Sequence, residues 1–514
     1  MSASTEIKKP TLRIIFSPSR TRDAAIAALA AVLFALSFPR AGAAWCAPLG
    51  AAALYWSWET ASLKRSFAYG WFAGWIFFTI TFWWWSTTIK DDVGILAYVA
   101  VMAGAALEAL AIGAAGVLTV LARRRMPLAV VPLAAACAFT AFEWFRSIGV
   151  LGVPFGQLGT TQADTALKVL AAYVGTSGLT FVLCALGFYV ADAVMRKTWK
   201  CLAAVCGFVI IATAAAWAGW PARGVLAPAI PVAAIQGNIK QSLKFRPGMV
   251  DEAIRRYTSM TKSAAMAQPK PRLIVWPETV IPESSGLNAD APSIVQFVGL
   301  ARAAAATVVV GSIATDATGS YNTLFFFTPD GLRATYEKRQ LVPFAEWFPG
   351  KNFLWWLPYI GKLNGGFGHG AVDGVYQTTA GLTVAPLICW ESAFGDLAYN
   401  QIKNGAQVLL ITTDDAWFGT SSGPYQHAQI AQMRAIESGD YVVRAAATGI
   451  SGIIAPDGTW SARSALETQA IVRGFIGPPV GSVFSRIGPN AIVLALSTLL
   501  IALFTIPWKR TDAA

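Results

Sequence analysis

The most prominent feature of the chain is a set of long apolar runs, seven before residue 221 and one after residue 490. A helix needs about 20 residues to span a bilayer core of roughly 30 Å, and most of these runs approach that length. We therefore expect a multi-pass bundle of about eight membrane helices. The runs cover residues 24–38, 43–59, 66–86, 93–121, 128–145, 167–194, 201–220 and 491–508.

The first two apolar runs are short, and they predict a helical hairpin. The AGA sequence that follows Pro39 leaves a second interpretation open, in which the first run is a cleaved secretory signal. We expect an uncleaved helix. In both cases the second run returns the chain to the inner side of the membrane, so the rest of the topology is unaffected.

Between the seventh and eighth runs, short apolar stretches alternate with amphipathic ones, which is typical of strand and helix repeats. We predict an α/β domain over residues 221–485, after a helical bundle over residues 1–220 and before a helix and tail over residues 486–514. The expected strands are residues 231–236, 273–276, 307–313, 322–328, 382–388, 408–413, 442–447 and 452–455. The expected helices are residues 250–266, 293–306, 396–405 and 424–438.

The composition agrees with a membrane protein. Hydrophobic residues make up 55% of the chain and charged residues only 13%, against about 25% charged residues in soluble domains. A net charge of +12 would suit a polyanionic partner, but the Lys and Arg residues cluster beside the apolar runs and form no basic stripe. We therefore expect a membrane bilayer and no nucleic acid as the partner of this charge.

The distribution of basic residues predicts the orientation, because Lys and Arg near helix ends favour the cytoplasmic side. One set of ends holds fifteen of them, within residues 8–22, 64–65, 123–125, 196–200 and 509–510. The other set holds five, namely Arg40, Lys90, Arg146, Lys168 and Arg223. Both termini are therefore expected in the cytoplasm, with the α/β domain on the outer face of the membrane.

Five of the six cysteines lie inside apolar runs, where a thiol acts as a small hydrophobic side chain. The exception is Cys389, which follows an expected strand. The chain has only two histidines, His369 and His427, and neither lies near a cysteine pair. We therefore expect no metal site and no cofactor.

Three segments place a reactive side chain at the end of an apolar strand, where α/β folds expose functional groups to a cleft. They are LIVWPET with Glu278, YEKRQLVPFAE with Lys338 and APLICWES with Cys389. Together, in this order, they resemble the nitrilase superfamily, whose members use a Glu, Lys and Cys triad. The resemblance implies an α-β-β-α sandwich domain and acyl transfer through a thioester on Cys389.

The implied chemistry assigns a role to each residue. A free thiol is only a few per cent thiolate at neutral pH, so Glu278 would take the proton from Cys389. We expect a dry site to raise the pKa of Glu278 towards neutrality. Lys338 would stabilise the anionic intermediate. Glu346 and Glu391 are alternative partners for Lys338, because Glu346 follows the LVPF run and Glu391 lies two residues beyond the nucleophile.

The resemblance narrows to the apolipoprotein N-acyltransferase family when two further segments are included. They are IQGNIKQSLKF at 235–245 and DAWFGTSSGPYQHAQIAQMRAIESGDYVVRAAATGIS at 415–451. The similarity covers nearly the whole chain, and the helices before and after the catalytic domain fit it too. Phe245, Ala345 and Trp390 stand where this family usually has Trp, Gly and Tyr. Phe245 and Trp390 are therefore candidates for contacts with the substrate or the triad.

The family resemblance implies a two-step, ping-pong cycle in the bacterial inner membrane, with the catalytic domain in the periplasm. A phospholipid donor, expected to be phosphatidylethanolamine, would acylate Cys389 and leave as a lysolipid. The acceptor would be the free α-amino group of the N-terminal diacylglyceryl-cysteine of an apolipoprotein. Because this amine attacks only when it is neutral, Glu278 would act as a base a second time.

An aromatic segment, EWFPGKNFLWWLPYIGKLNGGFGHG, lies between Lys338 and Cys389. Trp and Tyr are common at membrane interfaces, whereas so much aromatic surface would favour aggregation in a soluble hydrolase. Two interpretations are open: an arm over the active site that dips into the outer leaflet, or rings that pack on the helix bundle. The aromatic residues concerned are Trp347, Phe348, Phe353, Trp355, Trp356 and Tyr359.

Several other polar residues are expected to be structural. His427 lies in an expected helix, and the triad already has a base. Glu143 and Arg146 are three residues apart on one helix and are expected to form an intrahelical pair. A structural ion-pair set is expected from Arg434, Glu437 and Arg444.

Two other functions use the same features. A membrane-anchored amidase or nitrilase-type hydrolase would pass the thioester to water, but eight helices far exceed what an anchor needs. A transporter with an outer regulatory domain would explain the helices, but the sequence shows no pair of broken helices in matching halves. We therefore expect acyl transfer from lipid to amine.

Overall fold

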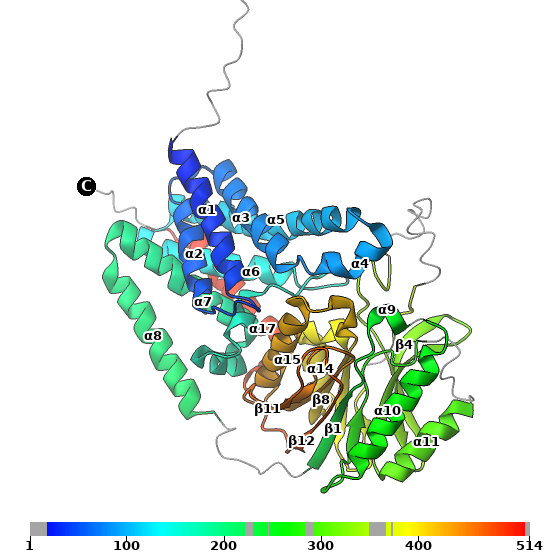
Figure 1. Cartoon of the computed structure of the whole chain (residues 1–514). Helices are drawn as coiled ribbons and strands as arrows, with labels where there is room; N and C mark the ends of the chain where they lie inside the picture. Colours follow the sequence, from blue (N-terminus) through cyan, green and yellow to red (C-terminus); the bar gives the residue numbers. More distant parts are fainter. Residues whose placement is uncertain are drawn as a thin grey trace, which may run out of the picture.

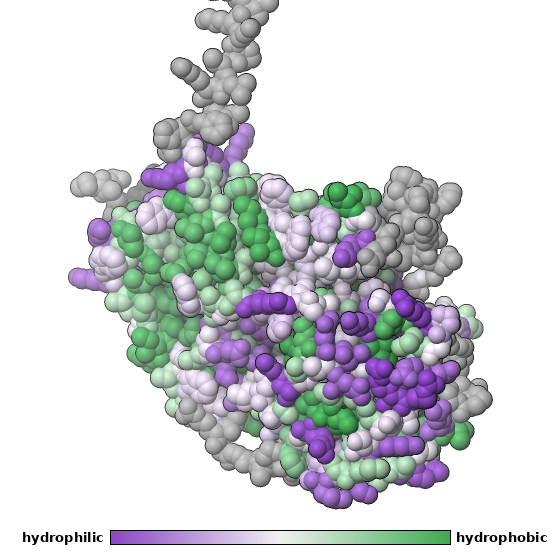
Figure 2. Space-filling model, in the orientation of Figure 1, coloured by the Kyte–Doolittle hydropathy of each residue, from purple (hydrophilic) through white to green (hydrophobic). Residues whose placement is uncertain are grey.

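The computed structural model describes residues 18–220, 230–244, 246–282, 292–348, 366–371 and 374–508. Within these ranges the chain forms two parts that pack on each other, a helical bundle and an α/β domain (Figure 1). Figure 2 shows apolar residues gathered over the bundle and hydrophilic residues over the α/β domain. This division agrees with a membrane-embedded part and a water-exposed part.

The bundle consists of helices from both ends of the described chain. The last of them, α17, packs against α6 and α7, so the chain returns to the bundle after the α/β domain (Figure 1). The bounds are α1 Pro18–Leu36, α2 Cys46–Ser57, α3 Leu63–Thr81, α4 Trp85–Val93, α5 Leu96–Arg125, α6 Val131–Phe145, α7 Ala171–Arg196, α8 Trp199–Ala218 and α17 Pro489–Thr505, with short 3-10 helices η2 Leu128–Val130, η3 Leu158–Gln162 and η4 Ala166–Leu170.

Four helical stretches among the described residues are long and apolar enough to span a membrane: Leu96–Arg125, Leu128–Phe145, Ala166–Arg196 and Trp199–Ala218. The expected count of about eight membrane helices is therefore not confirmed. Helix α2 has only 12 residues and α17 has 17, fewer than the ~20 that span a bilayer core. The apolar run at 66–86 is also interrupted, because α3 ends at Thr81 and α4 begins at Trp85.

Small residues allow α3 and α5 to lie close together. A side-chain carbon at Gly70 would lie 2.6 Å from the carbonyl oxygen of Ile112, and one at Gly74 would lie 2.9 Å from the side chain of Ala109. Both distances are too short for carbon, so this approach requires glycine. Close packing of this kind stabilises helix pairs in lipid, where the hydrophobic effect between helices is absent.

The α/β domain contains two six-stranded sheets. The strand order is β12-β1-β2-β3-β4-β5 in the first and β11-β10-β9-β8-β7-β6 in the second. Each has three neighbouring parallel strands, β1 to β3 and β7 to β9, flanked by antiparallel strands. The bounds are β1 Ile230–Gln236, β2 Leu273–Val275, β3 Thr307–Thr315, β4 Ser320–Thr328, β5 Gly331–Glu337, β6 Tyr376–Gln377, β7 Thr383–Ile388, β8 Val408–Thr413, β9 Tyr441–Ala446, β10 Gly452–Ile454, β11 Trp460–Arg463 and β12 Ala470–Ile476.

Helices cover the outer face of each sheet and produce four layers. Helices α10 (Met249–Ala265) and α11 (Pro292–Ala304) pack on the first sheet, and α14 (Gly395–Lys403) and α15 (Gly423–Ser438) pack on the second. A third apolar core fills the space between the sheets. This is the α-β-β-α sandwich of a nitrilase-like domain, as the sequence implies, with α15 facing the bundle (Figure 1).

Polar contacts join the sandwich to the bundle. Glu437 on α15 accepts hydrogen bonds of 2.7 Å from both the backbone N–H and the hydroxyl of Thr176 on α7. Arg434 pairs with Glu437 at 2.7 Å. The expected ion pair between Arg434 and Glu437 is therefore present, but Arg444 pairs elsewhere, with Asp415 at 2.7 Å.

The expected strands and helices of this domain are confirmed to within a few residues. Four strands were not predicted from the sequence, namely β5, β6, β11 and β12. They lie at or beside the outer edges of the sheets, where one face meets water and the run of apolar residues is broken. Short half-exposed strands carry too weak a pattern to be recognised.

Candidate active site

Three strand ends bring the expected triad residues together. Glu278 lies three residues beyond β2, Lys338 directly follows β5, and Cys389 directly follows β7. The ammonium of Lys338 donates to Glu278 Oε1 at 3.0 Å. The charges of both residues act on the thiol of Cys389. Segments far apart in the sequence thus place a carboxylate, an ammonium and a thiol in one site.

Glu278 is buried and held on both carboxylate oxygens. Oε1 accepts from Lys338 and, at 2.7 Å, from the Asn322 side chain, while Oε2 accepts from the backbone N–H of Asp414 at 2.8 Å. The loop that carries Glu278 passes directly over Gly311. A side-chain carbon there would lie 2.1 Å from the Pro277 carbonyl oxygen, so glycine is needed for Glu278 to reach this position.

Lys338 lies between two carboxylates. Its Nζ donates to Glu278 at 3.0 Å and to Glu346 Oε1 at 2.8 Å, and Glu346 Oε2 accepts from the backbone N–H of Val342. Burial acts to lower the pKa of Lys338, but the two carboxylates hold it well above its ordinary value. Lys338 is therefore a permanent cation. We call Glu278, Lys338 and Glu346 the Lys338 cluster.

Glu391 makes different contacts from Glu346. Its carboxylate accepts from the backbone N–H groups of Ile388 and Arg339 at 2.7 and 2.6 Å, and from the hydroxyl of Tyr336 at 3.0 Å. It therefore ties the end of β5 to the end of β7. Of the two carboxylates suggested by the sequence, Glu346 contacts Lys338, and Glu391 holds the backbone on either side of the site.

The pKa of Glu278 differs from the expectation. Burial acts to raise the pKa of Glu278, but Lys338 and the hydrogen bonds from Asn322 and Asp414 together hold it below its usual value. The expected upward shift is therefore wrong. Burial and the Glu278 carboxylate raise the pKa of Cys389 well above its ordinary value, against the effect of Lys338. At rest the site holds a carboxylate and a protonated thiol.

Cys389 differs from the other cysteines in its backbone conformation. Its φ of 49° lies in the left-handed region, which is uncommon for residues other than glycine and occurs often at functional sites. Cys389 is partly exposed, as are Cys201 and Cys206, whereas Cys46, Cys137 and Cys184 are buried in the bundle. Within the described ranges, no group of three or more His, Cys, Asp or Glu side chains is placed to hold a metal ion.

A second polar cluster holds the backbone of Cys389. The Cys389 carbonyl oxygen lies 2.8 Å from Ser392 Oγ and 3.1 Å from His427 Nε2. His427 Nδ1 lies 2.9 Å from Asp415 Oδ1, and Arg444 donates to Asp415 Oδ2 at 2.7 Å. We call Ser392, Asp415, His427 and Arg444 the His427 cluster.

The protonation of the His427 cluster follows from its charges. Burial and Arg444 lower the pKa of His427, against the effect of Asp415. The neutral imidazole then donates from Nδ1 to Asp415, because an ionised carboxylate only accepts. Nε2 carries no hydrogen in this tautomer, so the Cys389 carbonyl oxygen accepts its hydrogen bond from Ser392. These contacts agree with the structural role expected for His427. The sequence did not single out Ser392 or Asp415 individually, although Asp415 begins the DAWFG segment.

Trp390 links the site to the bundle. Its ring stacks on Phe155, with centroids 5.2 Å apart and planes within 14°, and its edge meets Trp85 at 6.0 Å. Trp347 lies against the ring of His369 at 5.5 Å. Phe348 packs against Phe344, with ring centroids 5.1 Å apart. The remaining aromatic residues suggested by the sequence lie outside the described residues, as does most of the proposed arm: Phe245, Phe353, Trp355, Trp356 and Tyr359.

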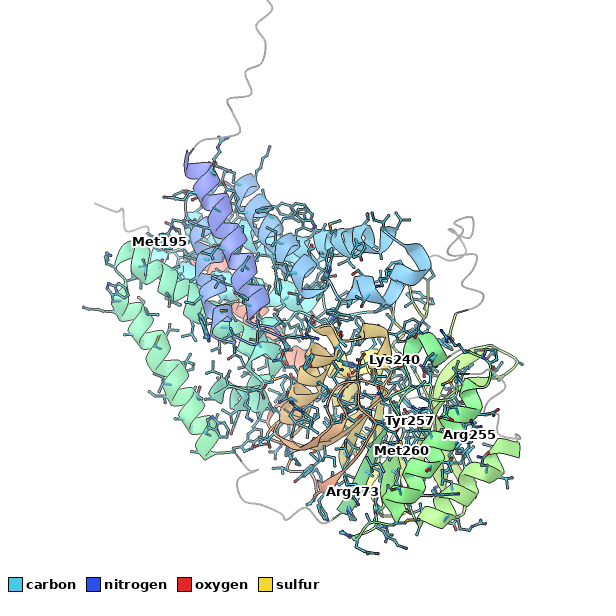
Figure 3. The ribbon with its side chains drawn as sticks, viewed as in Figure 1. Met195, Lys240, Arg255, Tyr257, Met260 and Arg473 are labelled. Carbon is cyan, nitrogen blue, oxygen red and sulfur yellow. The ribbon has the colours of Figure 1, made fainter. Side chains whose placement is uncertain are left out.

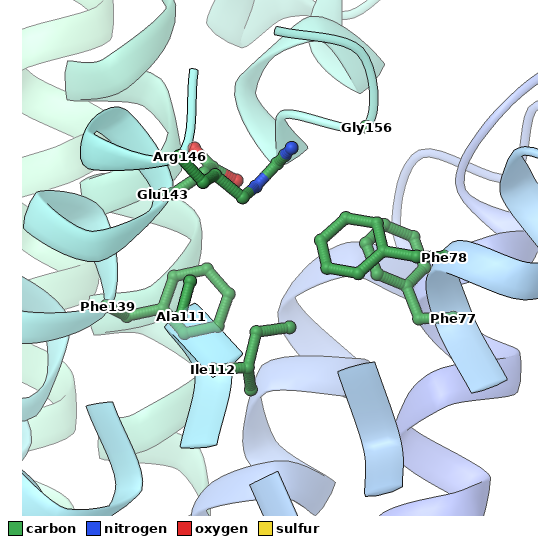
Figure 4. A pocket seen from close by; sticks show the side chains of 8 residues that line it. All are labelled: Phe77, Phe78, Ala111, Ile112, Phe139, Glu143, Arg146 and Gly156. Carbon is green, nitrogen blue, oxygen red and sulfur yellow. The ribbon is translucent and has the colours of Figure 1, made fainter. Parts of the chain in front are cut away.

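Glu143 and Arg146 line a small pocket inside the bundle (Figure 4). Their contacts there differ from the expected intrahelical ion pair. Arg146 does not pair with Glu143. It pairs with Glu108 on α5 at 3.1 Å, while Glu143 accepts from Leu158 N and the Thr180 hydroxyl. The partners of Arg146 and Glu143 therefore come from other segments of the bundle and not from the same helix. This agrees with the tendency of charged groups in a membrane bundle to face protein.

Two family models match the chain. The carbon-nitrogen hydrolase model matches residues 231–474, and the model of the apolipoprotein N-acyltransferase N-terminal domain matches residues 30–189. The first range includes both sheets. The second runs from α1 into α7, so the two models together account for both parts of the fold.

Relatives over most of the chain are named apolipoprotein N-acyltransferase. The one from Methylococcus capsulatus is 30% identical over 88% of this chain and 89% of its own, and that from Geobacter metallireducens is 30% identical over 91% and 92%. The one from Photobacterium profundum is 29% identical over 85% of each. The solved structure of Saccharomyces cerevisiae Nit3, a member of branch 10 of the nitrilase superfamily, is 21% identical, with a TM-score of 0.40 over 51% of this chain and 95% of its own.

Proposed function

The chain belongs to the apolipoprotein N-acyltransferase family, and on that premise we propose that Cys389 carries the acyl group as a thioester between two half reactions. Glu278 is the base, and Lys338 stabilises the anionic intermediates. The observation that carries this proposal is the 3.0 Å contact between Lys338 and Glu278 in the electrostatic environment of Cys389. It joins a base and an anion-stabilising cation at one nucleophile.

In the first half reaction, the sulfur of Cys389 attacks the ester carbonyl of a phospholipid while Glu278 accepts the thiol proton. The carbonyl oxygen becomes an oxyanion, which the ammonium of Lys338 stabilises. When the intermediate collapses, the carbon–oxygen bond of the ester breaks. Glu278 then returns the proton to the leaving oxygen, so a lysolipid departs and the thioester remains.

In the second half reaction, the neutral α-amino group of a diacylglyceryl-cysteine attacks the thioester. Glu278 accepts a proton from this nitrogen, and Lys338 again stabilises the oxyanion. The carbon–sulfur bond breaks to release an amide, and the proton returns to the sulfur of Cys389. The enzyme regains its starting state, and no other reactant is required.

The shared contacts of Lys338 support this order of events. At rest, its positive charge lies between the carboxylates of Glu278 and Glu346. Once Glu278 accepts a proton, it no longer competes as an anion for the ammonium. Lys338 then becomes available to the oxyanion at the moment that negative charge appears there.

We propose phosphatidylethanolamine as the donor and the N-terminal cysteine of a diacylated apolipoprotein as the acceptor. The stacking of Trp390 on Phe155 supports access from lipid, because the residue after the nucleophile packs on the bundle. We also propose that the chain lies in the bacterial inner membrane with its termini in the cytoplasm. The α/β domain then lies in the periplasm, in agreement with the distribution of Lys and Arg.

The direct test is detection of the thioester. Purified protein in detergent is incubated with phosphatidylethanolamine that carries a labelled acyl chain, and the mass of the peptide containing Cys389 is measured. We expect one labelled acyl group on the wild type and none on Cys389→Ala. Cys206→Ser, on α8, is the matched control and should be acylated like the wild type. An unlabelled Cys389 peptide in the wild type would contradict the proposal.

The second half reaction is tested by adding a synthetic diacylated lipopeptide with a free N-terminus to the acylated protein. Conversion to a triacylated lipopeptide, with loss of the label from Cys389, supports transfer to the amine. The same lipopeptide with an acetylated N-terminus should leave the thioester intact. Release of free fatty acid in place of the triacylated product would instead identify a hydrolase.

A further inference from the structure

A buried lysine outside the expected triad lies next to the base. Lys244 is the last residue of the short helix α9 (Gln241–Lys244), and only about a tenth of its side chain is exposed. Its Nζ donates to the hydroxyl of Thr279 at 2.7 Å and pairs with the carboxylate of Asp414. A buried ammonium is costly unless its charge is neutralised and its N–H groups are bonded. Lys244 therefore has two specific partners.

Both partners of Lys244 also control the position of Glu278. Thr279 follows Glu278 in the chain and has a φ of 44°, a left-handed conformation that is unfavourable for a β-branched residue. Asp414 donates its backbone N–H to Glu278 Oε2 at 2.8 Å. Lys244 thus holds the residue after the base and the residue that bonds the base.

The surroundings make the charge of Lys244 important. A cavity beside Glu278 and Asp414 has mainly apolar walls, which include Ile239, Met249, Ala253, Tyr257 and Val280. Tyr257, which lies on α10, is labelled in Figure 3 and marks the side of the α/β domain where this cavity lies. In such a setting an uncompensated Asp414 carboxylate would be strongly unfavourable and would repel the nearby charge of Glu278. Lys244 is the cation that neutralises Asp414.

We propose that Lys244 is a positioning residue for the base, acting through its simultaneous contacts with Thr279 and Asp414. It holds the Glu278 carboxylate at the end of β2 and keeps it ionised by neutralising the neighbouring Asp414. Lys244 does not contact the reacting atoms. The inference rests on the proposed function, because it gives Glu278 the role of base.

A purely structural role would make a different prediction. Loss of a structural ion pair lowers stability and leaves the pH dependence of the remaining activity unchanged. Loss of a residue that keeps Glu278 ionised raises the pKa of the base, so the acidic limb of kcat/KM moves to higher pH. The charged and titratable groups that surround Glu278 or pair with its neighbours are Lys338, Glu346, Cys389, Asp414 and Lys244.

The test compares Lys244→Met, which keeps the aliphatic stem, with Lys244→Arg, Asp414→Asn and the Lys244→Met/Asp414→Asn double variant. Lys240→Met is the matched control, because Lys240 is exposed and lies four residues away (Figure 3). Thioester formation from labelled phosphatidylethanolamine is measured across pH on detergent-purified full-length protein. Thermal unfolding identifies any variant that does not fold.

We expect Lys244→Met to lower the rate of acylation by roughly a hundredfold, as small misplacements of catalytic groups do. Its acidic limb should move up by about one pH unit or more, the size of effect that a neighbouring charge exerts. Lys244→Arg and the double variant should return the limb towards that of the wild type, because each restores charge balance around Asp414. Lys240→Met should match the wild type.

Two results would overturn the inference. One is a Lys244→Met variant whose acylation rate and acidic limb of the pH profile match those of Lys240→Met. The other is a double variant with the same displaced limb as Lys244→Met, since removal of both charges should cancel. If Lys244→Met does not fold, the acidic limbs of the double variant and of Lys244→Arg are compared with that of the wild type. A displaced limb in these two variants would overturn the inference. Glu278→Gln separates the two proposals, because full activity in that variant would reject Glu278 as the base itself.

Discussion

The Lys338 cluster and the His427 cluster both adjoin Cys389 and are both buried, yet they use charge in different ways. In the Lys338 cluster one ammonium is shared by two carboxylates, and the charge of one of them, Glu278, acts on the thiol of Cys389. In the His427 cluster both oxygens of Asp415 have a fixed partner, His427 on one and Arg444 on the other. Our proposal assigns the chemistry to the Lys338 cluster and the support of the Cys389 backbone to the His427 cluster.

The pKa values of the two carboxylates, Glu278 and Asp415, move in the same direction. Burial acts to raise the pKa of Asp415, but Arg444 and His427 outweigh it and hold the value at about 2. Glu278 is also held below its usual value, mainly by Lys338. Both carboxylates are therefore ionised, and burial alone does not distinguish a base from a structural anion. Both carboxylates have partners on each oxygen. The difference is that the cation beside Glu278 is shared with Glu346, whereas Arg444 pairs with Asp415.

The largest expected effect is on chemistry in the Lys338 cluster. Glu278→Gln removes the base, and we expect acylation to fall by about ten thousandfold or more, as loss of a triad member does in other enzymes. The fold should persist, because Lys338 keeps Glu346 as a partner. Rapid-quench measurement of the thioester tests this, with Glu337→Gln as the matched control. Acylation within tenfold of the wild type would reject Glu278 as the base.

The next effect is on stability in the His427 cluster. Asp415→Asn leaves the buried guanidinium of Arg444 without its carboxylate, so the free energy of unfolding should fall by about 3–5 kcal/mol. Thermal unfolding in detergent measures this, with the exposed Asp330→Asn as control. An unchanged unfolding temperature would mean that the cluster is not the support that its contacts indicate.

The same carboxylate predicts how stability depends on pH. The folded pKa of Asp415 is about 2, below its ordinary value. Its stabilising contribution is therefore complete above the ordinary Asp pKa of about 3.9 and is lost as the pH falls through about 2. In Asp415→Asn this part of the acid dependence of unfolding should disappear. Retention of the wild-type acid dependence would assign it to other groups.

A smaller effect is expected at the third member of the Lys338 cluster. Glu346→Gln leaves Lys338 to Glu278 alone, so the acylation rate should fall roughly a hundred- to a thousandfold as Lys338 loses its orientation. With one anion fewer beside Lys338, the pKa of Glu278 falls further, and the acidic limb of kcat/KM should move to lower pH. A shift to higher pH would contradict the shared-cation arrangement, and Glu337→Gln again serves as control.

The smallest effect is expected where the site meets the bundle. Phe155→Leu removes the stacking partner of Trp390, a contact worth about 0.5–1.5 kcal/mol. We expect a few-fold rise in KM for phospholipid and little change in kcat. Phe145→Leu, at an exposed position on α6, is the matched control. An unchanged KM would mean that this stacking does not contribute to lipid access.

Much of the α/β domain could be predicted from the sequence, because its central strands are buried on both faces and form continuous apolar runs. The membrane part was harder. A run of 21 apolar residues at 66–86 looks like one helix, but the chain turns between Thr81 and Trp85. Hydropathy records how apolar a segment is, whereas turns inside it depend on what packs against it.

The sequence by itself predicted the reactive groups, in the order typical of the family: a carboxylate and a thiol that follow buried strands, and an ammonium that follows the half-exposed edge strand β5. It did not determine their partners. Lys244 and Asp414 are 170 positions apart, and Glu346 and Glu391 are equally plausible neighbours of Lys338 in the linear chain. Ion pairs between distant segments depend on strand order and loop geometry, which only the tertiary structure decides. The downward shift in the pKa of Glu278 has the same origin, because it arises from donors in or directly after three separate strands, β4, β5 and β8.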